Sequence, residues 1–220
     1  MAIHRIRYSD DELLKKYRHS KVRYKEDWAH IDEMIRSTVA DCSTDDYVSV
    51  HKRVVLVDSI YRSQLNRSVG RFAHSRVARE IASDSAVPAA ILQVGRYSAL
   101  TYQALPAILS AHSAIMTASS KAIPLGSHAA SLRSFASKYL HFHATIVPIY
   151  DSRAARTISR FAGSNARSDV DNLNDSLASI DSADISYTSF CCRMVAVVER
   201  LRMLGQVPEV KEVDHMLWTE

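Results

Sequence analysis

The sequence predicts an all-α protein, and three features of composition and pattern lead to this fold class. Only five glycines and five prolines interrupt 220 residues, so turns are few and elements are long. The alanine, leucine and arginine content favours helices. Apolar residues recur every three or four positions, which is the period of one helical face. We expect a compact bundle of about 9–11 helices with almost no strand, as a single domain of residues 1–220 with possible lobes at 1–120 and 121–220.

The N-terminal third predicts three helices. Ser9 and Glu12 form a capping box, which should open a short helix that ends near His19. A second helix is expected at 24–40. A third, at 45–66, is apolar nearly all round and should lie in the middle of the domain. Within it Asp58 should pair with Arg62 one turn later, and the basic residues that follow should be solvated.

The rest of the chain continues the helical pattern. A turn at 121–126, which contains proline and glycine, should precede a helix capped by Ser127. The polar segment 164–186 reads as a mobile loop or insertion. The other helices are expected at 89–96, 98–119, 151–163, 170–180, 187–204 and after Pro208.

Charge and cysteine content limit the possible partners and locations. The net charge of +4 is compatible with DNA as a partner but does not require it. Three cysteines, two of them adjacent at 191–192, form no disulfide framework or metal-ligand spacing, so we expect a reducing cytoplasm. The N-terminus lacks the apolar core of a signal peptide, and no apolar run is long enough for a bilayer. We expect no membrane association, no cofactor and no metal; a protein partner remains open.

Chemically distinctive residues crowd into the stretch from Leu132 to Ile158, LRSFASKYLHFHATIVPIYDSRAARTI. Lys138 follows apolar residues on a predicted helix, and a desolvated amine can become a nucleophile for Schiff-base chemistry. Asp151 starts the next helix, where a carboxylate could stabilise a cationic sugar-like transition state. Three arginines, spaced to share one face of that helix, could bind phosphates: Arg153, Arg156 and Arg160.

Each of these residues also has a purely structural interpretation, which we weigh slightly ahead of catalysis for the lysine–aspartate pair. Lys138 could extend its ammonium to solvent past an apolar stem, and Asp151 is a good N-cap. The arginine face could be merely solvated. His141 and His143 lie on opposite sides of a helix and cannot both bind one metal ion, so no metal site is expected.

A lysine in an apolar helix, followed by proline–aliphatic–aromatic–aspartate at the next helix start, resembles the helix-hairpin-helix DNA glycosylase superfamily. The resemblance spans about 30 residues. It implies a hairpin that binds a DNA phosphate, here at residues 123–128 with Ser127 and His128 at the phosphate. In bifunctional members the lysine attacks the sugar carbon and the aspartate assists; the matching residues are Lys138 and Asp151. The segments SKYLHFH…VPIYDSR and VDHMLW also resemble a set of uncharacterised bacterial proteins.

Two functions follow from these expectations. The first is a DNA glycosylase or glycosylase/lyase that takes a modified or damaged base into a pocket, with Lys138 as nucleophile and Asp151 as its electrostatic partner. Phe142, Tyr150 and Trp218 would wall that pocket. The alternative is a catalytically inactive helical module that binds nucleic acid or a protein. The predicted hairpin favours this alternative, because it has one glycine where the superfamily normally has two or three.

Overall fold

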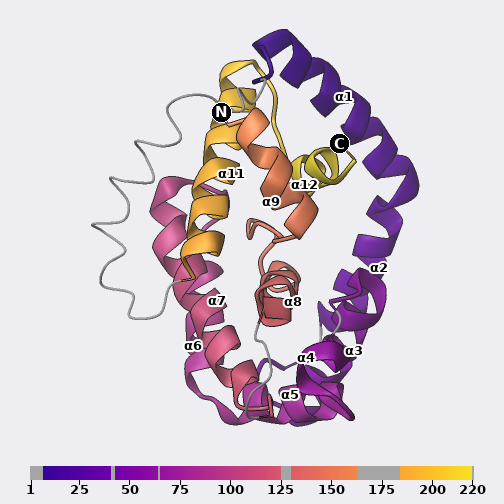
Figure 1. Cartoon of the computed structure of the whole chain (residues 1–220), viewed down its shortest axis with the longest axis vertical. Coiled ribbons are helices and arrows are strands. Elements are labelled where there is room, and N and C mark those ends of the chain that lie inside the picture. Colours follow the sequence, from indigo (N-terminus) through magenta and orange to yellow (C-terminus); the bar gives the residue numbers. More distant parts are fainter. Residues whose placement is uncertain (1–6, 41–42, 64, 125–129, 163–183, 220) are drawn as a thin grey trace, which may run out of the picture.

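The all-α prediction is confirmed. A computed structural model describes residues 7–40, 43–63, 65–124, 130–162 and 184–219, in which eleven α-helices and two short 3-10 helices occur without any strand (Figure 1). The α-helices are α1 (Asp10–Asp27), α2 (Ala29–Ala40), α3 (Tyr47–Tyr61), α4 (Leu65–Val69), α5 (Ala73–Ser83), α6 (Ala86–Val94), α7 (Leu105–Ser120), α8 (Ala130–His141), α9 (Ser152–Thr157), α11 (Ile185–Met203) and α12 (Val210–Trp218). The 3-10 helices are η1 (Tyr102–Ala104) and η2 (Ile158–Arg160).

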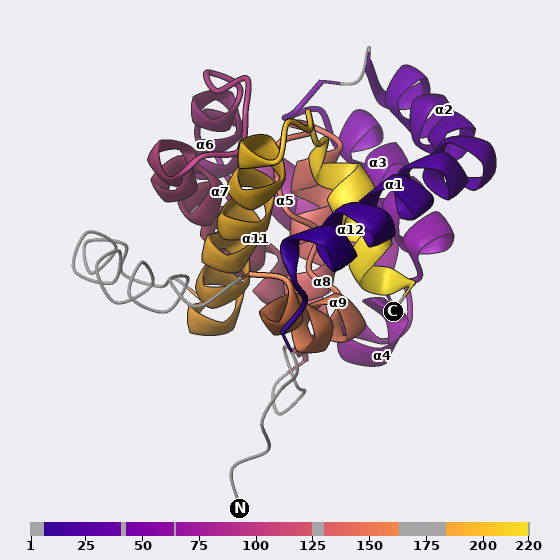
Figure 2. The same cartoon turned by 90° about the horizontal axis from the view of Figure 1, so that it is seen from above.

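Helix α8 forms the centre of the bundle, and the other helices surround it (Figures 1 and 2). Every side chain from Phe135 to Phe142 is buried, including polar ones. The sequence placed the third helix in this position, and that prediction was wrong. Helix α3 keeps an exposed side that carries Lys52 and Ser59, because its partners α5 and α8 pack on the other side.

The apolar core is one continuous cluster. It extends from Leu13 in α1 to Leu217 in α12 and includes residues from both 1–120 and 121–219. Helix α12 is unusual in this core: from Val210 to Leu217 all eight side chains are buried, although four of them are charged or titratable. Burial of such groups requires polar partners. Glu212 pairs with Tyr17 and Lys21 of α1, and Lys211 and Asp214 line the candidate site.

Helix α1 is longer than the sequence predicted. The capping box is confirmed: the Ser9 hydroxyl accepts a hydrogen bond from the Glu12 backbone, and the Glu12 carboxylate accepts one from the Ser9 backbone at 2.8 Å. No break follows His19, and the helix continues to Asp27. Ser20, the residue after the predicted end, is buried and shares a 2.8 Å hydrogen bond with Nδ1 of His215.

Helix α3 is shorter than the sequence predicted. It begins after Asp46 and ends at Tyr61, where Arg62 adopts a left-handed backbone conformation with φ of 48°. The predicted pair between Asp58 and Arg62 is therefore wrong. The Asp58 carboxylate instead accepts a hydrogen bond from the Leu65 backbone at 3.2 Å and lies 2.8 Å from Nε2 of His74 in α5.

The remaining differences concern helix ends. Helix α6 begins at Ala86, so Pro88 lies in its first turn, where no intrahelical N–H partner is needed. Helix α11 begins at Ile185, capped by the Asp184 carboxylate. The predicted helix 170–180, most of the polar segment 164–186, and the predicted phosphate-binding residues Ser127 and His128 lie outside the described residues. No helix in the described ranges has the length and apolar character needed to span a membrane.

Candidate functional site

A cleft of about 690 Å³ is formed by residues of α1, α3, α8 and α12 and by the entry to α9. Four of the predicted site residues line it: Lys138, Tyr150, Asp151 and Trp218. Phe142 does not line the cleft; only 8% of it is exposed, and its ring packs against that of Tyr61 with centroids 5.4 Å apart. The other lining residues are Tyr24, Trp28, Ile60, Tyr61, Arg62, Ser63, Ser134, Ile149, Ser152, Lys211, Asp214 and His215.

Lys138 lies in the last turn of α8, and only 6% of it is exposed. The ammonium therefore does not extend into solvent. The structural interpretation from the sequence, in which the amine reaches solvent past an apolar stem, is wrong. Its Nζ donates a hydrogen bond to the backbone oxygen of Tyr61 at 3.0 Å. Burial lowers the Lys138 pKa, while the charges of Asp151 and Asp214 oppose that shift. A lowered pKa increases the fraction of neutral, nucleophilic amine.

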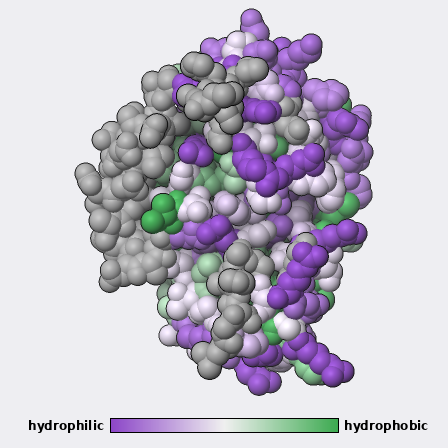
Figure 3. Space-filling model, viewed as in Figure 1, coloured by the Kyte–Doolittle hydropathy of each residue, from purple (hydrophilic) through white to green (hydrophobic). Residues whose placement is uncertain are grey.

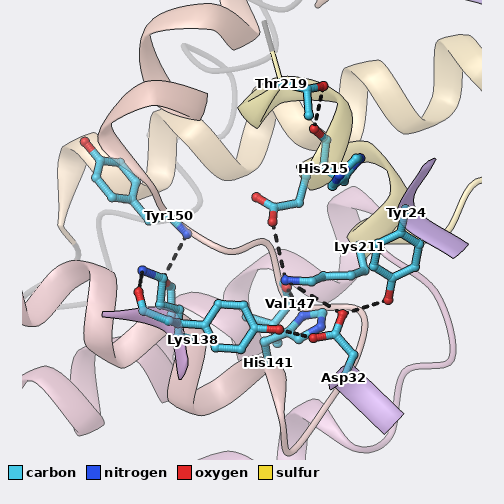
Figure 4. A network of polar contacts seen from close by, with 12 residues as sticks. Tyr24, Asp32, Lys138, His141, Val147, Tyr150, Lys211, His215 and Thr219 are labelled. Carbon is cyan, nitrogen blue, oxygen red and sulfur yellow. Dashed lines mark hydrogen bonds and ion pairs between the residues drawn. The ribbon is translucent and has the colours of Figure 1, made fainter. Parts of the chain in front are cut away.

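Asp151 is the N-cap of α9, as its sequence context predicted. Its carboxylate accepts a hydrogen bond from the Arg153 backbone at 2.7 Å. Immediately before it, the backbone N–H of Tyr150 donates to Oγ of Ser137 at 2.9 Å (Figure 4). Because Ser137 precedes Lys138 in α8, this bond holds the start of α9 beside the helix that carries the lysine. Residues 13 positions apart in the sequence thus line one cleft.

Helix α12 supplies two charged residues that the sequence did not single out. Nζ of Lys211 lies 3.6 Å from the Asp214 carboxylate and 4.4 Å from the centroid of the Tyr61 ring. Burial raises the Asp214 pKa to about 6, although the positive charges of Lys211 and Lys138 oppose the shift. In the sequence, the segment VDHMLW, which includes Asp214, indicates only a resemblance to uncharacterised bacterial proteins.

A buried carboxylate from α2 organises one wall of the cleft. Asp32, which is 2% exposed, accepts hydrogen bonds from the hydroxyls of Tyr24, at 2.7 Å, and Tyr61 (Figure 4). Nζ of Lys211 lies 4.0 Å away. One carboxylate thus joins α1, α2, α3 and α12. Burial, the hydrogen bond to Asp32 and the charge of Asp32 all raise the Tyr24 pKa above its ordinary value.

Two tryptophan rings line the cleft, and one of the predicted arginines lies against one of them. The rings of Trp28 and Trp218 meet edge to face with centroids 6.4 Å apart, and the guanidinium of Arg153 lies 5.9 Å from the Trp218 ring centroid. All three predicted arginines are exposed. They do not form one α-helical stripe, however, because α9 ends at Thr157 and Arg160 lies in the tighter turn η2. None of Arg153, Arg156 and Arg160 lines the cleft.

The surroundings of His141 and His143 indicate structural roles for both histidines. Nδ1 of His141 lies 2.8 Å from the backbone oxygen of Val147, and burial lowers the His141 pKa to about 3. Burial also lowers the His143 pKa to about 3. Across the described ranges, no three His, Cys, Asp or Glu residues are grouped so that they could hold a metal ion.

Comparison of the chain with family models, with curated proteins and with solved structures found no match in any of the three. The proposed function therefore rests on the chemistry of the cleft.

Proposed function

We propose that the protein is a DNA glycosylase with lyase activity, which takes a modified or damaged base into the cleft. The observation that carries this proposal is that Lys138 and Asp151 line one concave site. The cleft, at about 690 Å³, falls in the usual range for ligand pockets and has room for a nucleobase and its sugar. The resemblance of this stretch to helix-hairpin-helix glycosylases supports the same reaction.

In the proposed reaction the neutral Lys138 Nζ forms a bond to the sugar C1′, and the bond from C1′ to the base breaks. The electron pair leaves on the base, which takes up a proton; the new ammonium nitrogen releases one, so the proton count is unchanged. Cleavage of the bond from C1′ to the ring oxygen then leaves a protonated Schiff base on Nζ, and the ring oxygen takes a proton from an acid. Asp214 lies in the same cleft, and burial raises its pKa to about 6, so its protonated form can supply that proton below about pH 6 and in a smaller fraction at neutral pH.

Asp151 has a different role in this proposal. Positive charge develops on the sugar as the base leaves, and a nearby carboxylate stabilises it. Asp151 is held for this purpose by its cap to α9 and by the bond from the Tyr150 backbone to Ser137. A group whose position is set before the reaction needs no reorganisation in the transition state.

The aromatic residues of the cleft support binding of an extruded base. Tyr24, Tyr61 and Tyr150 line its interior, while Trp218 is 44% exposed at its mouth. Stacking on such rings stabilises an unpaired base by about 1–3 kcal/mol. We place such an enzyme in the bacterial cytoplasm, where its DNA substrate is found.

The alternative is a module that binds nucleic acid or a protein without catalysis. One observation favours it: both proposed catalytic groups already have partners, since Lys138 donates to the Tyr61 backbone and Asp151 caps α9. Catalysis requires that the lysine leave its partner when substrate binds.

Borohydride trapping distinguishes the two functions. The protein is incubated with duplex DNA carrying an abasic site, or one of a panel of modified bases, and borohydride reduces any Schiff base to a stable adduct. We expect an adduct with the native protein and none with Lys138→Gln. Lys121→Gln is the matched control, because Lys121 is 53% exposed on its side chain and pairs with Asp84 away from the cleft. Asp151→Asn should slow adduct formation.

Three results would count against the proposal. No adduct with any substrate, from folded protein, would exclude lyase action on them and favour the binding module. An adduct retained in Lys138→Gln but lost in Lys211→Gln would move the nucleophile to Lys211, the other buried lysine of the cleft. An unchanged rate in Asp151→Asn would remove the electrostatic role of Asp151.

A further inference from the structure

A second hollow, of about 400 Å³, lies between α1 and α12. We refer to it as the α1 groove. Met216 and Thr219 line it from one face of α12, whereas the cleft is lined by another face of the same helix that carries Lys211, Asp214 and Trp218. The α1 groove is lined by Glu12, Lys15, Lys16, His19, Ser20, Arg23, Met216 and Thr219.

The α1 groove is strongly basic. The α1 sequence from Leu13 to Lys25 contains six lysines and arginines and no acidic residue. Lys15 and Arg23, both exposed, form no ion pair within the described ranges. The one carboxylate of the groove, Glu12, is hydrogen-bonded to Ser9 in the capping box at the end of α1.

The lysine, histidine and arginine side chains of the groove are arranged along the helix and not around it. Lys15, His19 and Arg23 are spaced four residues apart, which places them in one row. Lys16 lies next to that row, with its Nζ 4.8 Å from the centroid of the Tyr8 ring. Figure 3 shows the hydrophilic surface over α1 along one edge of the molecule. The lysine and arginine charges along this groove match the charge of a phosphodiester backbone.

The α1 groove and the cleft share a wall. Ser20 lines the groove, His215 lines the cleft, and the two side chains are joined by a 2.8 Å hydrogen bond. Burial has the largest effect on the His215 pKa and lowers it. The charges of Lys211, in the cleft, and Arg23, in the groove, lower it further, while the charge of Asp27 and the hydrogen bond to Ser20 raise it. Charges on both sides of the wall are therefore close enough to act on one imidazole.

We propose that the α1 groove binds the phosphate backbone of duplex DNA beside the nucleotide that enters the cleft. This inference rests on the proposed function, because it places the strand that the cleft would act on. When a nucleotide is extruded, its base enters the pocket while the flanking phosphates remain at the protein surface. Those phosphates require cations next to the cleft, and the α1 groove carries cations on the other side of the Ser20–His215 wall. At the surface, Thr219 of the groove is next in the chain to the exposed Trp218 of the cleft.

Salt-dependent binding tests this inference. Binding of a duplex of about 20 base pairs is measured by fluorescence anisotropy between about 50 and 200 mM salt. The duplex carries a tetrahydrofuran abasic analogue, which cannot form a Schiff base, so binding is measured without chemistry. Lys15→Ala/Arg23→Ala is compared with Arg18→Ala/Lys25→Ala. The control residues are exposed on α1, carry the same charge and do not line the groove.

The two double variants should differ although their net charges are equal. Each phosphate contact contributes about 0.9 to the slope of log K against log salt, so the groove variant should lose a slope of about 2. The control variant should keep nearly the native slope. A native slope in Lys15→Ala/Arg23→Ala, or an equal loss in both variants, would overturn the inference, because the effect would then reflect overall charge. Thermal unfolding of each variant checks that the fold is retained.

The results separate this inference from the proposed function. Adduct formation in the trapping assay, together with a native salt slope in the groove variant, would refute the α1 groove alone. A reduced slope in the groove variant without adduct formation would support the groove and leave the protein as a DNA-binding module. Absence of any salt-dependent binding would refute the groove.

Discussion

The buried carboxylate of Asp32 offers a direct test of how the cleft is held together. We consider the substitution Asp32→Asn, which changes shape little but removes the charge. Asp32 is 2% exposed and accepts hydrogen bonds from the hydroxyls of Tyr24 and Tyr61, with Nζ of Lys211 4.0 Å away. All three partners belong to helices other than α2, so the substitution tests tertiary contacts.

The expected loss follows from these contacts. The two hydroxyls donate to different carboxylate oxygens, and asparagine keeps only one acceptor, so one tyrosine would have to accept from the new NH2 group. A hydrogen bond to a charged group contributes about 1.5–3 kcal/mol, against about 1 kcal/mol between neutral groups, so the two contacts together should lose about 2 kcal/mol. Lys211 would keep its ion pair with Asp214 at 3.6 Å. Loss of the more distant charge of Asp32 should lower the free energy of unfolding by about 1 kcal/mol more. We therefore expect the free energy of unfolding to fall by about 2–4 kcal/mol.

The assay is urea unfolding monitored by circular dichroism at neutral pH. Glu33→Gln is the matched control, because Glu33 is the next residue of α2, its side chain is 70% exposed and it pairs with Arg36 at 3.3 Å. An exposed pair of this kind contributes under about 0.5 kcal/mol. The reasoning would be refuted if Asp32→Asn lowered the free energy of unfolding no more than Glu33→Gln, while the slope of that free energy against urea concentration stayed unchanged.

Two further predictions concern pH and fluorescence. Burial lowers the pKa of His112 to about 4 and that of His141 to about 3. The unfolded chain therefore binds protons below about pH 6.5 that the native state does not. We expect the free energy of unfolding to fall from pH 6.5 toward pH 4, by up to about 1.4 kcal/mol per pH unit for each histidine. Asp214, with its pKa raised to about 6, contributes in the opposite direction below pH 6, so the net loss should be smaller than the histidine sum. A urea midpoint that stays constant or rises between pH 7 and pH 5 would contradict this. The chain has only two tryptophans, Trp28 and Trp218, and both line the cleft. Their emission should change when abasic-analogue DNA binds, and an unchanged spectrum at saturation would place the DNA away from the cleft.

Part of the candidate site could be predicted from the sequence because its residues lie close together in the chain. Lys138 and Asp151 stand 13 residues apart in one stretch, and a helix followed by a capped helix start could be recognised there. The proximity of the two side chains depends on a tertiary contact, the hydrogen bond from the Tyr150 backbone to Ser137. Ser137 reads in the sequence as an ordinary polar position of a helix, so its role could not be predicted.

The rest of the site comes from distant parts of the chain. Asp32, Tyr61 and Lys211 meet at one wall of the cleft although up to 179 residues separate them. The sequence contains no local signal for such a meeting, since each lies on a helix whose pattern is already explained by packing. The Asp58 pairing failed for a related reason: helical spacing favoured Arg62, but the left-handed backbone at Arg62 ends the helix, and His74 from α5 takes that place.

The sequence by itself determined that the chain is helical and where several helices begin, because helix propensity, apolar period and capping depend on residues a few positions apart. It did not determine which helix lies at the centre. Helix α3 is the more apolar in sequence, yet α8 is enclosed, since enclosure depends on how many other helices pack around it. Only the tertiary structure decided that α12 is buried with its charges, that these charges face Lys138, and that the α1 groove lies on the other side of the Ser20–His215 wall. Such long-range contacts arise from the packing of the whole chain.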